Sequence, residues 1–410
     1  MTLRHAARGA ALLLLLPLSL TPAFADVPKS GNAVFDAAVG LIEKNFYSPA
    51  ALPAFDAAAT AVVNDATGKP LVTGPAIDKL IAALGVSHTG RYTPDQVDYY
   101  ELSNVFRFPL RDLVRRQYPR GEVVYEGIGI ASKVIDGRRF VTDVYDGAPA
   151  ALAGVKAGDE ILSVDGKPFS EVGSFGGKSG GAVALEVRHT ADAAPMTLKV
   201  GVEKLDPMQT YMDAIRDSVR IIDRDGRKIG YVHIWVYTSD EVTAILNQEL
   251  ATKLKDVDGM IVDMRSRWGG GPADAAETFV GGSADMQVVA NDGKPEYINT
   301  RFHKPVVAII DEGTRSSMEI MAYGLKKNGI PLVGQPTAGD VLAARAFALP
   351  DDSILELAVA DVIVDGQRLE ANPVTPTVAV PFDVRYANGA DPQMDAALAA
   401  MGKRLAAGVN

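Results

Sequence analysis

The sequence predicts a protein of several domains, the largest of which is an α/β core with a mainly parallel sheet. Three successive patterns support this prediction. Apolar residues recur at helical spacing over residues 26–118, which indicates an N-terminal helical region. Short strand-like runs separated by Gly and Asp turns indicate a small β-rich domain over residues 119–205. Over residues 206–410, strand and helix patterns alternate, which is typical of a mainly parallel sheet covered by helices.

The first 25 residues have the pattern of a signal peptide. Arg4 and Arg8 precede an apolar stretch over residues 10–20, and small residues at 23–25 precede Asp26. The stretch is too short to span a bilayer comfortably, although an uncleaved membrane anchor is the alternative interpretation. We therefore expect export to the periplasm or the medium, with cleavage near Ala25-Asp26.

The remaining chain of about 385 residues is acidic and contains no cysteine. Loss of Arg4 and Arg8 changes the formal charge from −10 to −12, which argues against nucleic acid and anionic membrane as partners. The lack of cysteine excludes disulfides, thiolate chemistry and a lipoprotein anchor. No second apolar stretch is long enough to span a membrane, so we expect no stable membrane insertion.

Local signals delimit the elements of the helical region and the core. In the helical region, "NAVFDAAVGLIEKNFY" and "AIDKLIAALG" have helical periodicity, and the second ends at Gly85. In the core, Ser239 is a candidate N-cap for the helix that follows it. The expected core strands are "KIGYVHIWVY", "DGMIVDMR", "KPVVAIID" and "IPLVG", and a helix is expected within "GGGPADAAETFVGG" and within "SSMEIMAYGLKKNG".

The β-rich domain resembles a PDZ domain. The similarity lies in "GIGI" at 127–130 and in "GAPAALAGVKAGDEILSVDGKPF" at 147–169, where a short helix, a Gly turn and a strand follow one another. In PDZ domains an extended peptide adds as a strand at the sheet edge. The resemblance implies that the backbone N–H groups of Gly127, Ile128, Gly129 and Ile130 receive the terminal carboxylate of a peptide. The alternative is a small β-domain that only spaces its neighbours.

Ser316 has two interpretations. Ser316-x-x-Glu319 before an apolar run fits the helix capping box, and that pattern alone indicates a cap. A nucleophilic serine would need a base, a group that orients the base, and oxyanion donors. Among the five histidines, His88 lies in a polar loop after a helix, where functional residues concentrate. The other four are His5, His189, His233 and His303.

Several segments, in order, resemble the serine peptidase family of C-terminal processing (tail-specific) peptidases. They are "LGVSHTGRYTP" (84–94), the PDZ-like domain, "GMIVDMRSRWGGG" (259–271), the segment 306–342 that contains "EGTRSSMEI", and "GQRLEANPVTPTVAV" (366–380). The resemblance covers most of the chain and implies a peptidase core of the crotonase/ClpP-like type. It also places Ser316 on the family's reactive serine.

The resemblance favours a Ser-His-Glu site over a Ser-Lys dyad. Many members carry Lys in a "GxxTxGK" turn, whereas this chain has "GQPTAGDV" with Asp340 at that position. The branch that includes the tricorn protease core uses Ser, His and Glu, and Ser87-His88 and Glu370 match its elements. The implied roles are His88 as general base, Glu370 as the group that holds and stabilises the imidazole, and Ser87 as an orienting residue.

The same resemblance assigns the oxyanion donors to the backbone N–H groups of Gly269 and Ser317. A flexible strand-to-helix turn is the alternative interpretation of residues 269–271. We expect no cofactor and no metal, because the chain has no HExxH motif, no Cys and few His. No G-x-S-x-G elbow surrounds Ser316, which argues against an α/β-hydrolase.

The sequence therefore predicts an exported serine endopeptidase that acts on protein or peptide substrates with an accessible C-terminus. Two alternatives stay open. One is a catalytically inactive, PDZ-containing peptide-binding protein on the same fold, for which the absent Lys is the supporting feature. The other keeps the fold but binds small apolar ligands.

Overall fold

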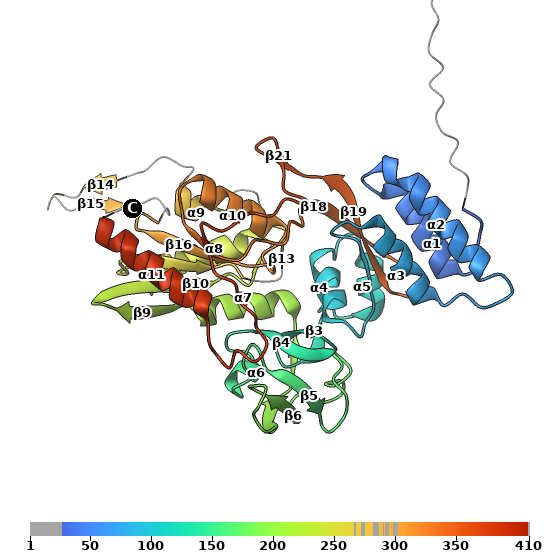
Figure 1. Ribbon diagram of the computed structural model, residues 1–410, viewed down its shortest axis with the longest axis horizontal. Helices are drawn as coiled ribbons and strands as arrows, with labels where there is room; N and C mark the ends of the chain where they lie inside the picture. The colour runs from blue at the N-terminus through green and yellow to red at the C-terminus, as the bar shows by residue number, and fades with distance from the viewer. Residues whose placement is uncertain are drawn as a thin grey trace, which may run out of the picture.

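The structure is a computed structural model that describes residues 27–265, 268–271, 275–281, 287–289, 291, 295–297 and 302–408. The expected signal peptide lies outside the described residues. Figure 1 shows three parts: blue N-terminal helices at one end, a teal and green β-rich domain below, and a core in yellow to red. Across the described part of the chain, no helix is both long and apolar enough to cross a membrane.

The N-terminal region is mainly helical, as the periodicity predicts. Helix α3 ends at Gly85, whose φ of +61° lies in the left-handed region that glycine adopts without strain. The elements are α1 (Ala33–Asn45), the short η1 (Pro49–Ala51), α2 (Leu52–Asp65), α3 (Thr73–Leu84), β1 (Gly90–Tyr92), α4 (Val97–Val105) and α5 (Arg111–Gln117).

A hairpin from the C-terminal half of the chain joins this region. Strands β18 (Leu342–Ala348) and β19 (Ile354–Asp361) pair with each other, and β19 pairs antiparallel with β1. The hairpin's apolar residues share a core cluster with α1, α2 and α3. In Figure 1 the orange-red hairpin lies beside the blue helices. Through the pairing of β1 with β19, the helical region thus packs against a segment that lies more than 250 residues later in the sequence.

The middle domain is an antiparallel sheet in the order β3-β4-β5-β6-β7, with α6 packed against it. Strand β3 stands at an edge of this sheet. Strands β2 and β8 pair where the chain enters and leaves the domain. The elements are β2 (Tyr125–Gly127), β3 (Ile130–Ile135), β4 (Arg138–Val144), α6 (Pro149–Leu152), β5 (Glu160–Val164), β6 (Ala182–Arg188), β7 (Met196–Gly201) and β8 (Glu203–Leu205).

The core is built on a six-stranded sheet in the order β22-β17-β16-β12-β10-β9. Every neighbouring pair except β9–β10 is parallel, so the predicted mainly parallel sheet is confirmed. Its strands are β9 (Arg220–Arg224), β10 (Arg227–His233), β12 (Gly259–Asp263), β16 (Val306–Ile310), β17 (Leu332–Gly334) and β22 (Val378–Ala379). The helices of the core are α7 (Pro207–Ser218), α8 (Asp240–Ala251), α9 (Glu277–Val280), α10 (Ser317–Lys327) and α11 (Pro392–Ala407).

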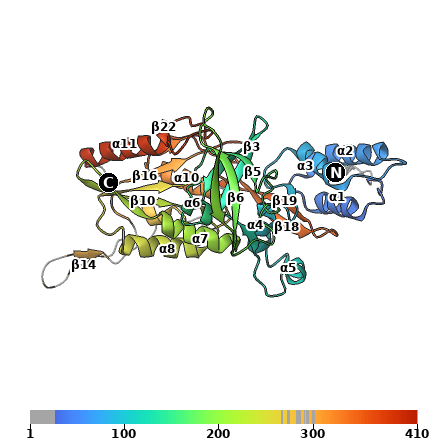
Figure 2. The same cartoon turned by 90° about the horizontal axis from the view of Figure 1, so that it is seen from below.

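Alternate residues of each buried strand face opposite layers of helices. In β16, Val306, Ala308 and Ile310 pack in the cluster that includes α7, α8 and α10, whereas Val307 and Ile309 pack against α11. Figure 2 shows α11 on one side of the sheet and α7 and α8 on the other. Burial on both faces explains why β12 and β16 contain consecutive apolar residues, instead of alternating apolar and polar ones.

Two predicted elements differ in detail. The segment "KIGYVHIWVY" was predicted as one strand, but the structure divides it into β10 and a separate strand β11 (Val236–Tyr237). Strand β11 pairs with β13 (Trp268–Gly269), outside the main sheet. Ser239 is the N-cap of α8, as predicted, but its side chain makes no capping hydrogen bond. Alternating apolar residues show that a segment is extended, but they do not show which partner it pairs with.

Candidate active site

Ser316 ends the turn between β16 and α10, and its backbone conformation is strained for a residue with a Cβ. Its φ is +59° and its ψ is −131°. The strained turn is held by hydrogen bonds from the Ser316 N–H to the Asp340 carbonyl oxygen (3.0 Å) and to Glu319 Oε1 (3.3 Å). Buried Glu319 also accepts the N–H groups of Gly339 (2.8 Å) and Asp340 (2.7 Å). The capping-box pattern therefore corresponds to a structural role of Glu319 beneath the turn.

The Ser316 hydroxyl faces His88. Ser316 Oγ lies 3.1 Å from His88 Nε2, which joins two residues that are 228 positions apart in sequence. His88 itself has a φ of +52°, so both partners adopt a conformation that is uncommon for residues with side chains. Burial, followed by the positive charge of Arg315, lowers the pKa of the His88 imidazole to about 4. The imidazole is therefore neutral at neutral pH.

Ser87 stands between His88 and Glu370. Ser87 Oγ lies 2.8 Å from His88 Nδ1 and donates to Glu370 Oε2 at 2.8 Å. Glu370 also accepts the backbone N–H of Ser87 at 3.2 Å and that of Val341 at 2.7 Å, and it is buried. The sequence-based hypothesis gave Glu370 the task of holding the imidazole. In the structure the Ser87 hydroxyl is the intermediate through which the carboxylate acts on the ring.

The donor and acceptor inventory fixes the tautomer of His88. The carboxylate of Glu370 accepts the single hydroxyl proton of Ser87, so Ser87 Oγ can only accept from the imidazole. His88 Nδ1 must then carry the ring proton, and Nε2 presents a lone pair to Ser316 Oγ. This row of four groups is able to withdraw the hydroxyl proton of Ser316.

The glycine turn lies beside Ser316. Gly269 forms an isolated parallel β-bridge with Ser316, and strand β13 pairs with β11 through Val236 and Tyr237. A Cβ on Gly269 would lie 2.9 Å from the Tyr237 carbonyl oxygen, which explains why the position suits glycine. The N–H groups of Gly270 and Gly271 both donate to that carbonyl oxygen, at 2.9 and 2.7 Å. Neither is therefore available to a bound substrate.

Ser317, the other predicted oxyanion residue, begins α10. Its side chain is buried, and its hydroxyl donates to the Tyr237 carbonyl oxygen at 3.3 Å and accepts the Gly271 N–H at 3.2 Å. The Ser317 side chain thus ties the start of α10 to the glycine turn. All the predicted residues of the peptidase site (Ser316, His88, Ser87, Glu370, Gly269 and Ser317) lie together.

A cavity of about 440 Å³ opens onto Ser316 and His88. One wall is apolar and comes from α4 and the residue after it, through Leu102, Val105 and Phe106. The remaining lining includes four charged residues from separate segments, namely Asp98, Arg315, Asp340 and Glu356. Among the residues that the structure describes, no lysine lines this cavity, and Asp340 takes part in the turn through its backbone.

Sequence reasoning missed the contribution of α4. Leu102, Val105 and Phe106 have the i, i+3, i+4 spacing of one helical face. That spacing shows which side chains lie together, but it does not show that the face borders an active-site cavity. Glu356 was missed as well, because it lies in the hairpin strand β19 and reaches the cavity only through the pairing of β19 with β1.

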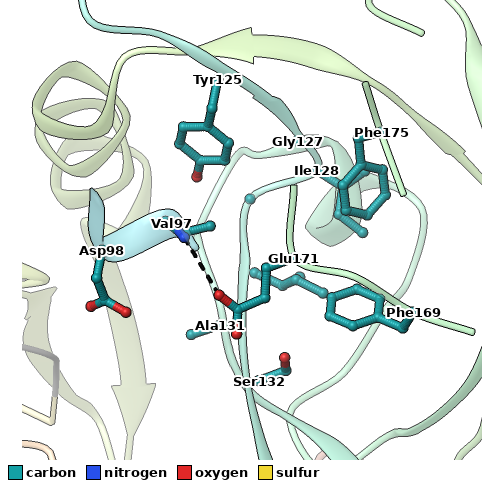
Figure 3. A pocket seen from close by; sticks show the side chains of 12 residues that line it. Val97, Asp98, Tyr125, Gly127, Ile128, Ala131, Ser132, Phe169, Glu171 and Phe175 are labelled. Carbon is teal, nitrogen blue, oxygen red and sulfur yellow. Dashed lines mark hydrogen bonds between the residues drawn. The ribbon is translucent and has the colours of Figure 1, made fainter. Parts of the chain in front are cut away.

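The four glycine-loop residues predicted to bind a peptide terminus lie apart from this site, in the middle domain. Gly127, Ile128, Gly129 and Ile130 line a groove that continues along β3 through Ala131 and Ser132 (Figure 3). The groove is also lined by Phe169, Glu171 and Phe175. At one end, the Val97 N–H of α4 donates to Glu171 at 3.4 Å, as the dashed line in Figure 3 shows. Asp98 lines both this groove and the cavity at Ser316.

The fold and the site define a class: an α/β core with a serine, a histidine and a carboxylate in one row, joined to a PDZ domain. Residues 228–380 match the model of peptidase family S41, and residues 140–175 match a PDZ domain. The core of the chain is therefore similar to peptidase family S41. The predicted family resemblance is thereby confirmed.

Curated relatives are carboxy-terminal processing proteases. The chain is 27% identical over 270 residues to carboxy-terminal processing protease CtpA of Bacillus subtilis, an alignment that covers 62% of this chain and 56% of that protein. It is 26% identical over 230 residues to a carboxyl-terminal-processing protease of a Picosynechococcus species, with 52% of this chain and 53% of that protein covered. The chain therefore spans about half the length of the curated relatives it matches.

Solved structures show a similar fold. The photosystem II D1 C-terminal processing protease superposes with a TM-score of 0.51 at 20% identity, over 88% of this chain and 97% of that one. Mature CPAF superposes with a TM-score of 0.53 at 13% identity, over 92% of this chain and 98% of that one. At these identities the likeness concerns the fold alone.

Proposed function

We propose that this chain is an exported serine endopeptidase that hydrolyses peptide bonds by a Ser-His-Glu mechanism. The observation that carries the proposal is the unbroken hydrogen-bonded row from Ser316 through His88 and Ser87 to Glu370. The curated relatives are processing proteases, which supports the same reaction. Export rests on the signal-peptide pattern of residues 1–25.

The first half of the reaction forms an acyl-enzyme. Ser316 Oγ attacks the carbonyl carbon of the scissile bond while His88 Nε2 takes the hydroxyl proton. The resulting imidazolium is stabilised by the Ser87 hydroxyl, which is itself polarised by the Glu370 carboxylate. His88 then gives its proton to the leaving amine as the C–N bond breaks, and an ester on Ser316 remains.

The second half returns the enzyme to its starting state. Water attacks the ester carbon while His88 takes one of its protons, and the C–O bond to Ser316 breaks as that proton returns to Oγ. The products are a new C-terminal carboxylate and a free enzyme. In both halves the negative oxygen of the tetrahedral intermediate needs N–H donors, and we assign them to Gly269 and Ser317. Each such donor typically accounts for about 10²–10³ in rate.

We propose that substrates engage the PDZ domain through their C-terminus. The edge strand β3 offers unpaired backbone groups to an added strand, and the groove beside it is lined by Ile128, Phe169 and Phe175. These side chains suit an apolar terminal residue. The loop at 127–130 offers backbone N–H groups to the carboxylate.

The test of the proposed function joins cleavage to chemical labelling. The chain lacking residues 1–25 is incubated with an unfolded, carboxymethylated protein, and the products are read by mass spectrometry. We expect discrete cleavage products, and we expect a fluorophosphonate to label Ser316. Absence of both, together with binding of peptides that have free C-termini, would instead establish an inactive peptide-binding protein.

The use of the PDZ groove has its own prediction. A fluorescent ten-residue peptide with a C-terminal valine and a free carboxylate should bind at least about tenfold more tightly than its C-terminal amide, because the amide removes the anionic group that the loop recognises. Fluorescence polarisation with the Ser316→Ala variant measures both without turnover. Equal affinities would contradict carboxylate recognition.

The lowered pKa of His88 predicts an acid-tolerant enzyme. Protonated His88 cannot accept the Ser316 proton, so kcat/KM should be flat above about pH 5 and fall only as the pH drops through about 4. An unperturbed histidine would lose activity near pH 6.5. The measurement is kcat/KM from pH 3.5 to 9, with circular dichroism confirming that the protein stays folded. An acid limb near pH 6.5 that persists in Glu356→Gln would contradict a desolvated His88.

A second carboxyl in the cavity needs a control. Burial raises the pKa of Glu356 to about 7. Any inflection near pH 7 that disappears in Glu356→Gln therefore belongs to that residue, and the acid limb that remains reports on His88.

A further inference from the structure

A buried carboxylate outside the Ser-His-Glu row contacts the strand that carries Gly269. Glu101, on α4, is 1% exposed. Its Oε2 accepts the indole N–H of Trp268 at 3.0 Å, and its Oε1 accepts the hydroxyl of Tyr211 at 2.5 Å. The residue was not part of any sequence motif, and the reaction described above does not use it.

The bond to Trp268 holds the glycine turn in addition to its pairing with β11. Strand β13 consists of Trp268 and Gly269 only, and it pairs with two residues of β11. A pair this short provides little stability on its own. Because the indole has a single donor, its bond to Glu101 sets the position of the Trp268 ring, and Gly269 follows directly in the chain.

The carboxylate is itself held from a second side. Tyr211 lies on α7, and its hydroxyl contacts both Glu101 and the hydroxyl of Tyr145 (3.3 Å), with the two tyrosine rings 5.2 Å apart in an edge-on arrangement. All three side chains are buried. A buried polar group held by several hydrogen bonds is rigid, because a displacement leaves a donor or an acceptor unpaired in a low-dielectric environment.

We propose that Glu101 is a positioning residue for the oxyanion turn: it holds Trp268, and through Trp268 it holds Gly269 in place for the reaction at Ser316. The proposal rests on the function proposed above. It assigns Glu101 no contact with the substrate. Its effect therefore falls on the stabilisation of the tetrahedral intermediate and not on the binding of the peptide chain.

The kinetic test compares variants that remove single groups. Trp268→Phe keeps an aromatic ring and removes the indole N–H, and Glu101→Leu keeps similar bulk and removes the acceptor. Each should lower kcat by about 10- to 100-fold with KM changed less than about threefold, because one misplaced oxyanion donor costs up to about 10²–10³. Glu101→Gln can still accept from Trp268 and donate to Tyr211, so it should recover most of the lost rate.

The chain offers a matched control for loss of a buried hydroxyl. Tyr211→Phe removes the hydroxyl that holds Glu101 and should lower kcat. Tyr99→Phe removes a hydroxyl on α4 that is equally buried but has no hydrogen-bond partner among the described residues, and it should leave kcat unchanged. The double variant Glu101→Leu/Trp268→Phe should be no slower than the slower single variant, because both act through one hydrogen bond. If the variants lost activity only because they were less stable, their kcat values would instead fall in proportion to the decrease in their melting temperatures.

A readout that needs no turnover separates this proposal from the proposed function. The chain has two tryptophans, so the NMR spectrum has two indole N–H signals, and Trp235, which bonds to Asp146 at 3.1 Å, serves as internal reference. In Glu101→Leu the Trp268 signal alone should shift and exchange faster with solvent, and the Gly269 amide signal should move with it. Wild-type kcat in Glu101→Leu, or an unmoved Gly269 amide, would overturn the proposal. An inactive wild-type chain with these NMR shifts would overturn only the proposed function.

Discussion

Replacing Ser316 by alanine should abolish cleavage of an unfolded protein, with kcat lower by at least roughly 10⁴-fold. In the proposed mechanism the variant removes the atom that forms the acyl bond, and it leaves the turn intact because the turn is held by backbone groups and by Glu319. His88→Ala should cost a comparable factor, because a nucleophile and its base act as one unit. Initial rates by mass spectrometry measure both, and an unchanged melting temperature shows that folding is preserved.

Ser239 provides the matched control. It also stands at the N-terminus of a core helix, but it is exposed and its side chain makes no capping bond. Ser239→Ala should cleave at the wild-type rate. Cleavage that persists in Ser316→Ala would show that the nucleophile is elsewhere and would remove the basis of the proposed mechanism.

Loss of the Glu370 carboxylate should be the next most damaging change. Glu370→Gln should lower kcat by about 10²–10⁴-fold with little change in KM. A neutral amide polarises the Ser87 hydroxyl less, and its NH₂ group would face either the Ser87 or the Val341 N–H. The imidazolium formed at His88 then loses stabilisation that matters only in the transition state.

The position of Ser87 between Glu370 and His88 allows this prediction to be tested with variants of Ser87. Glu370 reaches the imidazole through the Ser87 hydroxyl, so Ser87→Ala should lose a similar factor and Ser87→Thr, which keeps a hydroxyl, should lose much less. A double-mutant cycle measures the coupling. The variant Ser87→Ala/Glu370→Gln should be about as slow as the slower single variant, whereas multiplied losses would mean that the two residues act on His88 independently.

Local features of the fold were predictable because they depend on neighbouring residues. The apolar runs of β12 and β16 indicated buried strands, and Gly85 marked the end of α3. The capping-box pattern at Ser316 was correct about Glu319, which accepts the Ser316 N–H. It could not show where the Ser316 hydroxyl points, because that direction depends on the loop that carries His88.

The intermediate role of Ser87 illustrates the same limit. Ser87 and His88 are adjacent in sequence, and the family resemblance identified both as site residues. Adjacency does not specify that the hydroxyl donates to a carboxylate 283 positions away and accepts from the ring beside it. The role inferred for Glu101 was also invisible, since a glutamate within a helix is normally solvent-exposed.

The sequence by itself predicted the helical, β-rich and α/β segments and the order of the core elements, because periodicity and turn chemistry are properties of short segments. The family resemblance, carried by motifs within such segments, implied the residues of the Ser-His-Glu row. Only the tertiary structure decided how those residues meet. The pairing of β1 with β19 carries the His88 loop to the core, and the β18–β19 hairpin buries its apolar side against α1, α2 and α3. Such long-range pairings are selected by the total apolar surface that the folded chain buries, and no short segment contains that information.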